Sequence, residues 1–333
     1  MANTNDAAHP FDDIIDLVEK LADLESPAKD SLADVFNTLG RGLRPLGNLE
    51  QSLVMLAHIQ GQDIPQLARP LIAVFAGTHG VASQLSGQDI VKTSKSRVAS
   101  LTQGEAAVRG MSAELGAAFK VYEMGIEYPS EDFTREPSLS ERDCAAAIAF
   151  GMEVVAEGAD VIILGNAGLG AATAAAGIAM SLYGGAANYW AGGLNAKTRI
   201  EAVEKAVGLY SGVSRQPLET LRVFGGRDIA GMVGAILAAG HQRIPILLDG
   251  YVSCAAAAVL HAINPGSIAH CFASHCSAEP AHDALLSRLQ LAPILDLGIN
   301  IGDGTGGAFA LTILKAATAG LKTLKETNDV YES

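Results

Sequence analysis

Cysteine is scarce in this sequence. Only four cysteines, at positions 144, 254, 271 and 276, occur among the 333 residues, and no two of them form a Cys-x-x-Cys pair. So few cysteines in so long a chain exclude a disulfide framework of the kind that small secreted domains use. Their spacing, even with His275 included, also matches no standard zinc site. We therefore expect reduced, mostly buried thiols and no metal centre.

Basic residues and long hydrophobic runs are also in short supply. The 23 lysines and arginines are outnumbered by 36 aspartates and glutamates, which gives a formal net charge of -13. Such a chain repels polyanions, and no basic stripe follows a predicted helix, so nucleic acid is not an expected partner. The longest apolar stretches are interrupted by glycine or charge well before about 18 residues, and no signal-peptide pattern is present. We expect a cytoplasmic protein that does not enter a membrane.

Apolar residues make up 49% of the chain, enough to bury a large core. From Leu71 onward they gather in short continuous runs that alternate with longer helical stretches. The runs lie at residues 71–75, 119–123, 161–164, 244–248, 268–271 and 293–296. Continuous apolar strands joined by helices are typical of a parallel sheet that is covered on both faces. The sequence therefore predicts a doubly wound α/β fold.

Helical patterns fill the segments around these runs. Residues 10–21 and 46–59 have apolar residues at helical spacing and include no strand candidate. The segment Ser138-Leu-Ser-Glu141 has a capping-box pattern and predicts a helix from Glu141 to Glu157. A further helix is expected from Thr198 to Tyr210. The glycine- and alanine-rich stretch from Tyr183 to Lys197 predicts a long loop.

Two glycine-rich turns each follow an apolar run and precede a helix. The first includes Gly165, Gly168 and Gly170, and its backbone N–H groups and Thr173 are suited to hold a phosphate at a helix N-terminus. The alternative is that the glycines only allow tight strand-to-helix packing. The turn has neither the Gly-Lys-Ser/Thr of a Walker motif nor the Gly-x-Gly-x-x-Gly order of a dinucleotide fingerprint.

The second turn, residues 298–307, places Asp303 between two glycines. There a carboxylate on a rigid backbone is suited to act as a general base, provided that partial burial raises its pKa from about 3.9. The alternative is an N-cap for the following helix, made by Asp303 or Thr305. Both interpretations stay open on the sequence alone.

Other strand ends also carry polar residues. Thr78-His79-Gly80 and Asp249-Gly250 follow two of the runs, and the segment from Ser274 to His282 follows another. No Gly-x-Ser-x-Gly elbow accompanies that segment, so a Ser-His-acid hydrolase is a poor match. With the two glycine-rich turns, the turns at Thr78 and Asp249 make four at one edge of a predicted sheet, which favours a small-molecule site and hence an enzyme.

Together these segments resemble the nicotinate-nucleotide:dimethylbenzimidazole phosphoribosyltransferase family over nearly the whole chain. The resemblance is carried by residues 44–50, 74–81, 140–145, 164–173, 225–230, 248–251, 274–280 and 297–307. It implies a Rossmann-like parallel sheet, a small helical subdomain built from the chain ends, and a homodimer, with a heterodimer with a relative as the alternative. We accordingly divide the chain into an N-terminal helical segment (1–65), a nucleotide-binding core (66–320) and a C-terminal tail (321–333).

The resemblance also implies a reaction without a metal or cofactor. An azole nitrogen of 5,6-dimethylbenzimidazole attacks the anomeric carbon of nicotinate mononucleotide, nicotinate leaves, and α-ribazole phosphate forms. The family's glutamate base corresponds to Asp303, which is one methylene shorter, and a misplacement of about 1 Å can cost roughly a hundredfold in rate. A catalytically impaired relative that binds a nucleotide or an azole, and acts as a partner subunit, is the alternative.

The resemblance assigns further residues to the two substrates. For the phosphate and nucleotide they are Gly165, Asn166, Gly168, Leu169, Gly170, Thr173, Lys197, Arg199, Ser274 and His275. For the acceptor base they are Thr78, His79, Gln88, Ile301 and Gly302. Asn166 stands where the family has a glutamate, and Arg199 where it has a phosphate-binding lysine, with Lys197 nearby.

Overall fold

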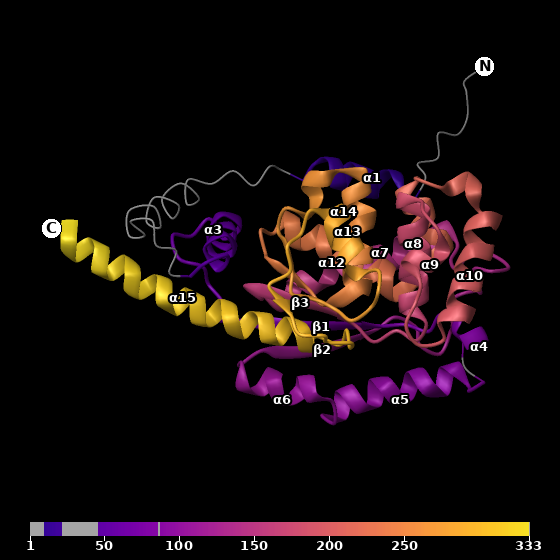
Figure 1. Ribbon diagram of the computed structural model, residues 1–333, viewed down its shortest axis with the longest axis horizontal. Helices are drawn as coiled ribbons and strands as arrows, with labels where there is room; N and C mark the ends of the chain where they lie inside the picture. Colours follow the sequence, from indigo (N-terminus) through magenta and orange to yellow (C-terminus); the bar gives the residue numbers. More distant parts are fainter. Residues whose placement is uncertain (1–9, 22–45, 86, 333) are drawn as a thin grey trace, which may run out of the picture.

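A five-stranded parallel sheet forms the centre of the molecule (Figure 1). The computed structural model describes residues 10–21, 46–85 and 87–332, without the side chains of residues 327–332. Arg44 and Pro45, which begin one of the family-like motifs, lie outside the described residues. The strand order is β2-β1-β3-β4-β5. The strands are β1 (Pro70–Ala76), β2 (Ala118–Glu123), β3 (Val161–Asn166), β4 (Ile246–Leu248) and β5 (Cys271–Ala273).

Helices cover both faces of this sheet, as the continuous apolar runs predict. The α-helices are α1 (Asp12–Glu19), α3 (Leu49–Gln60), α4 (Ala82–Leu85), α5 (Ile90–Gln103), α6 (Ala107–Glu114), α7 (Glu141–Gly151), α8 (Ala171–Tyr183), α9 (Ala187–Trp190), α10 (Ala196–Leu209), α11 (Pro217–Phe224), α12 (Arg227–His241), α13 (Gly250–Ile263), α14 (His282–Leu289) and α15 (Thr305–Glu332). Short 3₁₀ helices are η1 (Met152–Glu157), η2 (Ser211–Val213) and η3 (Pro265–Ile268).

Alternate strand residues belong to two different hydrophobic clusters. Leu71, Phe75 and Ile162 pack on one face with residues of α7, α8, α12 and α13. Ile72 and Ile163 pack on the other face with residues of α3, α6 and α15. Because successive side chains of a strand point to opposite faces, a strand with both faces covered has no polar alternation. The doubly wound α/β prediction is confirmed.

The predicted helix at residues 141–157 begins at Glu141 as expected, but its N-cap residue and its C-terminal end differ from the prediction. The hydroxyl of Ser140, not Ser138, caps the helix by accepting a 3.0 Å hydrogen bond from the Asp143 N–H. The α-helix α7 ends at Gly151, and a 3₁₀ turn continues to Glu157. A Cβ on Gly151 would lie 1.8 Å from the Gly231 carbonyl oxygen, so the change in helix type falls where α7 and α12 pack backbone to backbone.

Three other local predictions also need correction. The run 268–271 is not a strand at its start, because the Asn264 side chain accepts a hydrogen bond from the Gly266 N–H and begins η3; β5 starts only at Cys271. The run 293–296 contributes β7 (Leu295–Asp296), which pairs with β6 (His275–Cys276) in a separate small sheet. The predicted loop 183–197 contains α9 and the first residues of α10.

The two ends of the chain meet at α15. This helix is continuous across residue 320, where we placed the boundary between the core and the tail. Its buried face shares a hydrophobic cluster with Leu53 and Leu56 of α3, and Figure 1 shows α3 beside it. Residues 1–9 and 22–45 of the predicted N-terminal segment lie outside the described residues, so the division into 1–65, 66–320 and 321–333 stays a prediction. In the part of the chain that is described, no helix has the length and apolar character to cross a membrane.

Candidate active site

Two adjoining pockets lie beyond the carboxyl ends of β3 and β4. The larger has a volume of about 500 Å³ and the smaller about 120 Å³. Both are lined by Ala172, Val252 and the loop from Asn300 to Gly302. Asn166, Gly168 and Asp303 complete one side of the larger pocket, and Arg97 and Ser100 of α5 contribute to it as well. This position agrees with the place where doubly wound sheets bind their ligands.

The first glycine turn is fixed by its own hydrogen bonds. The N–H groups of Ala167 and Leu169 donate to the carbonyl oxygens of Phe75 and Gly77, and the Gly168 N–H donates to Asn166 Oδ1 at 2.8 Å. A Cβ on Gly168 would lie 2.0 Å from Asp228 Oδ2, so no larger residue fits there. Three backbone N–H groups of the turn that we assigned to a phosphate are thus already bonded, which is the arrangement expected of a tightly packed turn.

A buried carboxylate holds this turn from behind. Asp228 Oδ2 accepts a 2.8 Å hydrogen bond from the Asn166 amide, and His79 Nε2 lies 3.0 Å from Asp228 Oδ1. Burial opposes ionisation of Asp228, but the charge of His79 and the hydrogen bonds from His79, Asn166 and the Ile229 backbone outweigh it, so the pKa of Asp228 is lowered. The amide at position 166 therefore faces an anion, which it can satisfy as a donor.

Asp303 caps the following helix and also lines the larger pocket. Its Oδ1 accepts hydrogen bonds from the Thr305 N–H at 3.1 Å and the Thr305 hydroxyl at 2.6 Å, so it caps the first turn of α15. Asp303 also lines the larger pocket, although only 5% of its surface is exposed. Burial raises the pKa of this carboxyl, hydrogen bonds from Thr305 lower it, and the charge of Asp249 raises it, with a net upward shift.

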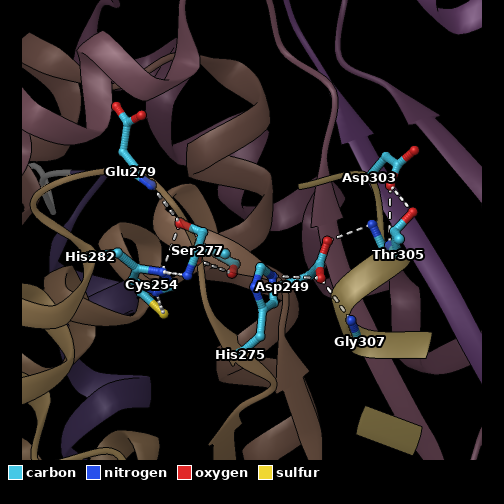
Figure 2. Close-up of polar contacts among 12 residues, drawn as sticks. Asp249, Cys254, His275, Ser277, Glu279, His282, Asp303, Thr305 and Gly307 are labelled. Atoms are coloured by element: carbon cyan, nitrogen blue, oxygen red, sulfur yellow. Dashed lines mark hydrogen bonds and ion pairs between the residues drawn. The ribbon is translucent and has the colours of Figure 1, made fainter. Parts of the chain in front are cut away.

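A second carboxylate supports the loop that carries Asp303 (Figure 2). Asp249, at the end of β4, accepts hydrogen bonds from the Gly304 N–H at 2.6 Å and the Gly307 N–H at 2.7 Å. His275 Nε2 lies 3.3 Å from the same carboxylate, and both side chains are fully buried. A Cβ on Gly306 would lie 2.1 Å from His275 Cδ2, so the helix start is packed directly on this pair. Gly304 itself has a φ of 100°, which favours glycine.

The segment after β5 does not form a hydrolase triad. His282 Nδ1 accepts a 2.8 Å hydrogen bond from the Ser277 N–H and lies 2.9 Å from the Ser277 hydroxyl, as Figure 2 shows. The other ring nitrogen faces the Cys254 sulfur at 3.3 Å, where a triad needs a carboxylate. Burial, aided by His275, lowers the pKa of His282 to about 3. A neutral histidine therefore orients Ser277, which lines the smaller pocket.

Known proteins resemble this chain along nearly its whole length. The family described as phosphoribosyltransferase matches residues 22–330. The chain belongs to this family. Nicotinate-nucleotide–dimethylbenzimidazole phosphoribosyltransferases from Brucella canis and Brucella anthropi are each 40% identical to it over 326 residues, covering 95% of this chain and 96% of the relative.

A crystal structure within the same family has the same fold. The phosphoribosyltransferase of that name from Thermus thermophilus superposes with a TM-score of 0.82 at 28% identity, and the match covers 90% of this chain and 96% of that one. The family resemblance inferred from the motifs, and the Rossmann-like sheet that it implies, are confirmed. Several motifs in one order carried this inference, whereas no single glycine turn was specific.

Some of the predicted site residues meet at the larger pocket and others do not. Asn166, Gly168, Ile301, Gly302 and Asp303 line it. The other predicted residues are not among those that line either pocket: Thr78, His79, Gln88, Gly165, Leu169, Gly170, Thr173, Lys197, Arg199, Ser274 and His275. Most of these are buried behind the turns, whereas Gln88 is exposed and accepts a hydrogen bond from the Thr93 hydroxyl.

The two predicted phosphate-binding cations lie away from the pocket lining for different reasons. The side chain of Lys197 is 90% exposed and lies 3.9 Å from Glu201. Arg199 is buried and forms an ion pair with Glu279, while it also donates to the Gly192 carbonyl oxygen. Glu279 lines the smaller pocket, so the direct effect of Arg199 is to neutralise that carboxylate.

Seven polar side chains that line the pockets were missing from the predicted set, and three of them, Asp249, Tyr251 and Asn300, lie within the family-like motifs 248–251 and 297–307. Ser277 and Glu279 lie within the family-like motif 274–280, so a signal for them was present. Arg97 and Ser100 lie one helical turn apart on α5, within a stretch that carries no motif. Only the position of α5 beside the glycine turns identifies them.

Proposed function

We propose that this chain transfers the ribose 5-phosphate group of nicotinate mononucleotide to 5,6-dimethylbenzimidazole or a related azole. The products are α-ribazole phosphate and nicotinate. The observation that carries this proposal is the Asp303 carboxylate, which lines the larger pocket beside the first glycine turn. The 40% identical relatives bear the name of this activity.

The proposed step balances without a metal or cofactor. The azole nitrogen forms a bond to the anomeric carbon of the ribose while the bond from that carbon to the pyridinium nitrogen breaks. The electron pair of the broken bond neutralises the ring nitrogen, so nicotinate leaves without needing a proton. The proton of the azole N–H passes to Asp303. A positioned general base of this kind contributes about 10²- to 10⁴-fold to the rate.

The environment of Asp303 suits a base. Its raised pKa makes the carboxylate a stronger proton acceptor than an exposed aspartate, while Thr305 holds one of its oxygens in place. Asp249 fixes the backbone on the C-terminal side of Asp303 through Gly304 and Gly307. A rigid support of this kind holds the carboxylate of Asp303 in one position.

The smaller pocket is our candidate site for the donor phosphate. It is lined by Ala172 near the start of α8, by Gly250 to Val252 at the start of α13, and by Ser277. Helix N-termini attract anions through their free N–H groups and their dipoles. Two carboxylates also line this pocket: Glu279 forms an ion pair with Arg199, and Asp249 accepts hydrogen bonds from the Gly304 and Gly307 N–H groups and lies beside His275. The larger pocket then takes the two aromatic rings.

The remaining predictions belong to the same proposal. We infer a cytoplasmic enzyme that forms a homodimer and uses small-molecule substrates, with a small helical subdomain from the chain ends. The alternative, an impaired relative that binds the nucleotide without transferring it, is distinguished by the experiment below.

The test is nicotinate release from nicotinate mononucleotide in the presence of dimethylbenzimidazole. Asp303→Asn keeps the size and a hydrogen-bond acceptor but cannot take a proton, so we expect turnover to fall about 100-fold or more. Nucleotide affinity, measured by calorimetry, should change little. Asp303→Glu keeps a carboxylate and should retain turnover.

Asp296→Asn is the matched control, because Asp296 is exposed on β7 outside both pockets. Unchanged turnover in Asp303→Asn would contradict the assignment of Asp303 as the base. Nucleotide binding without nicotinate release in the unmodified protein would favour the impaired relative.

A further inference from the structure

One cation in the larger pocket has no partner. Arg97 lines this pocket from α5, and among the described residues its guanidinium makes no hydrogen bond and no ion pair. Lys95 on the same helix lies 3.4 Å from Glu127, and Arg199 pairs with Glu279, whereas Lys92 is exposed and does not line the pocket. Arg97 is thus a charge that the protein leaves available to a ligand.

The surroundings of Arg97 fit an aromatic anion. Ser100, three residues further along the same helix, lines the pocket beside it and adds a hydroxyl. The rest of the lining is largely apolar or backbone, and includes Leu101, Ala171 and Val252. An apolar wall accommodates a flat ring, and a guanidinium beside it matches the geometry of a carboxylate, to which it donates two parallel hydrogen bonds.

The charges in the two pockets indicate which anionic group of the donor binds to Arg97. In the proposed reaction the donor carries two anionic groups, the phosphate and the carboxylate of its pyridine ring. The smaller pocket offers helix N-termini and Ser277 to the phosphate, which leaves the ring carboxylate for the larger pocket. There Asp303 repels a carboxylate and Arg97 attracts it, so the ring has one favourable orientation.

We propose that Arg97, assisted by Ser100, binds the carboxylate of the nicotinate ring and selects this donor over its carboxamide counterpart. The inference rests on the proposed function. Desolvation lowers the pKa of Arg97, but a guanidinium keeps its charge near neutral pH. When the ribose–pyridinium bond breaks, the ring loses its positive charge and becomes a net anion. The attraction of Arg97 for the leaving group therefore increases along the reaction.

The first test compares two donors, nicotinate mononucleotide and nicotinamide mononucleotide, with dimethylbenzimidazole as acceptor. Arg97→Met keeps the length of the side chain without its charge. We expect kcat/KM for the nicotinate donor to fall about 10- to 100-fold, the range of a lost charge-assisted hydrogen bond, with less than a twofold change for the nicotinamide donor. Arg97→Lys restores the charge without the planar fork and should recover part of the loss.

Lys92→Met is the matched control, because Lys92 is an exposed cation on the same helix and does not line the pocket. It should behave as the unmodified protein. An equal loss for both donors in Arg97→Met, or no loss for either, overturns the proposal. Thermal unfolding of each variant shows whether a loss comes from misfolding.

A second measurement needs no turnover. Calorimetry with nicotinate and with nicotinamide should show that Arg97→Met weakens only the binding of nicotinate, by about tenfold or more. If nicotinate affinity is independent of Arg97, the inference fails even where transfer is observed. If nicotinate binds through Arg97 but no transfer occurs, the proposed function fails and the carboxylate site stands. Selective loss of affinity for a benzimidazole carboxylate, with nicotinate unaffected, would assign Arg97 to the acceptor and overturn the proposal.

Discussion

The two glycine turns lie side by side at one edge of the sheet, yet they are held by opposite chemistry. In the first, the amide of Asn166 donates to the buried carboxylate of Asp228 behind the turn. In the second, the buried carboxylate of Asp249 accepts from the backbone N–H groups of Gly304 and Gly307. The turns touch directly, because the Asn166 N–H donates to the Gly302 carbonyl oxygen at 2.6 Å.

The three aspartates around the turns therefore have different positions: two support the backbone, and one lines the larger pocket. Asp228 and Asp249 are both fully buried and bind groups of the protein, so they stabilise the turns. Asp303 is the carboxylate that lines the larger pocket. The first turn therefore presents an amide and backbone to the larger pocket, and the second presents a carboxylate. Both turns depend on a buried acid, although Asp249 also lines the smaller pocket.

Removing the support of the first turn should have the largest effect on stability. Asp228→Asn removes the charge that faces His79, and breaking a buried pair in this way costs about 3–5 kcal/mol in the free energy of unfolding. Chemical denaturation measures the change. Asp89→Asn is the control, because Asp89 is an exposed N-cap of α5 and asparagine caps a helix about as well.

The pH dependence of the Asp228→Asn variant provides a further check. The pKa of Asp228 is lower in the folded protein, so its stabilisation is complete above the unfolded pKa of about 3.9 and is lost as pH falls through the folded pKa. The unmodified protein should therefore lose more stability than the variant as the solution is acidified below that value. Parallel curves would show that the Asp228 charge is not the source of the stabilisation.

Removing the support of the second turn should affect catalysis as well as stability. Asparagine at position 249 has one acceptor oxygen for the two N–H groups that the carboxylate now satisfies. We expect a loss of about 1–3 kcal/mol in stability and a fall in kcat of up to about 100-fold, since Asp303 shifts with its loop.

Steady-state kinetics and denaturation distinguish the two effects of Asp249→Asn. Asp296→Asn, on the exposed strand β7, again serves as the control. Reduced stability with unchanged kcat would restrict Asp249 to the fold and remove it from the positioning of Asp303.

The smallest effect is expected at Thr305, whose hydroxyl donates to the carboxylate of Asp303. Thr305→Val removes the hydroxyl that donates to Asp303 Oδ1 and lowers its pKa. The acid limb of kcat/KM against pH, where activity appears as Asp303 loses its proton, should move to higher pH. At alkaline pH the rate should change by less than about tenfold. Thr305→Ser keeps the hydroxyl and should restore the profile; an acid limb that stays in place would argue against Asp303 as the titrating base.

The sequence was sufficient to predict the fold where the pattern is strong. The strands β1 to β3 follow the predicted runs closely because each is several residues long, although only β1 and β3 are buried along their whole length. Short runs are ambiguous: Ile268 is apolar but belongs to a 3₁₀ turn, since the preceding Asn264 and Pro265 start that turn locally. The separate pairing of β7 with β6 depends on tertiary contacts that no local pattern encodes.

The candidate site was predictable only in part, for a similar reason. Asp303 was found because glycines mark its turn. Arg199 was expected to face a phosphate, but its partner Glu279 lies 80 residues away in the sequence, and no spacing reveals such a pair. Arg97 carries no motif and became visible once α5 was seen to line the pocket.

The tight packing of the glycines limits how this site can change by mutation. At Gly168 and Gly306 an added Cβ would lie 2.0 and 2.1 Å from the nearest side-chain atoms, and every amino-acid replacement of a glycine adds at least a Cβ. The backbone of both turns is therefore closed to stepwise substitution. Positions 166 and 303, where the resemblance implies a departure from the family pattern, lie two and three residues from these glycines in the sequence. Substitutions that change the substrate preference are therefore expected at the neighbouring side chains. The glycines must be retained because they fix the backbone that positions those side chains.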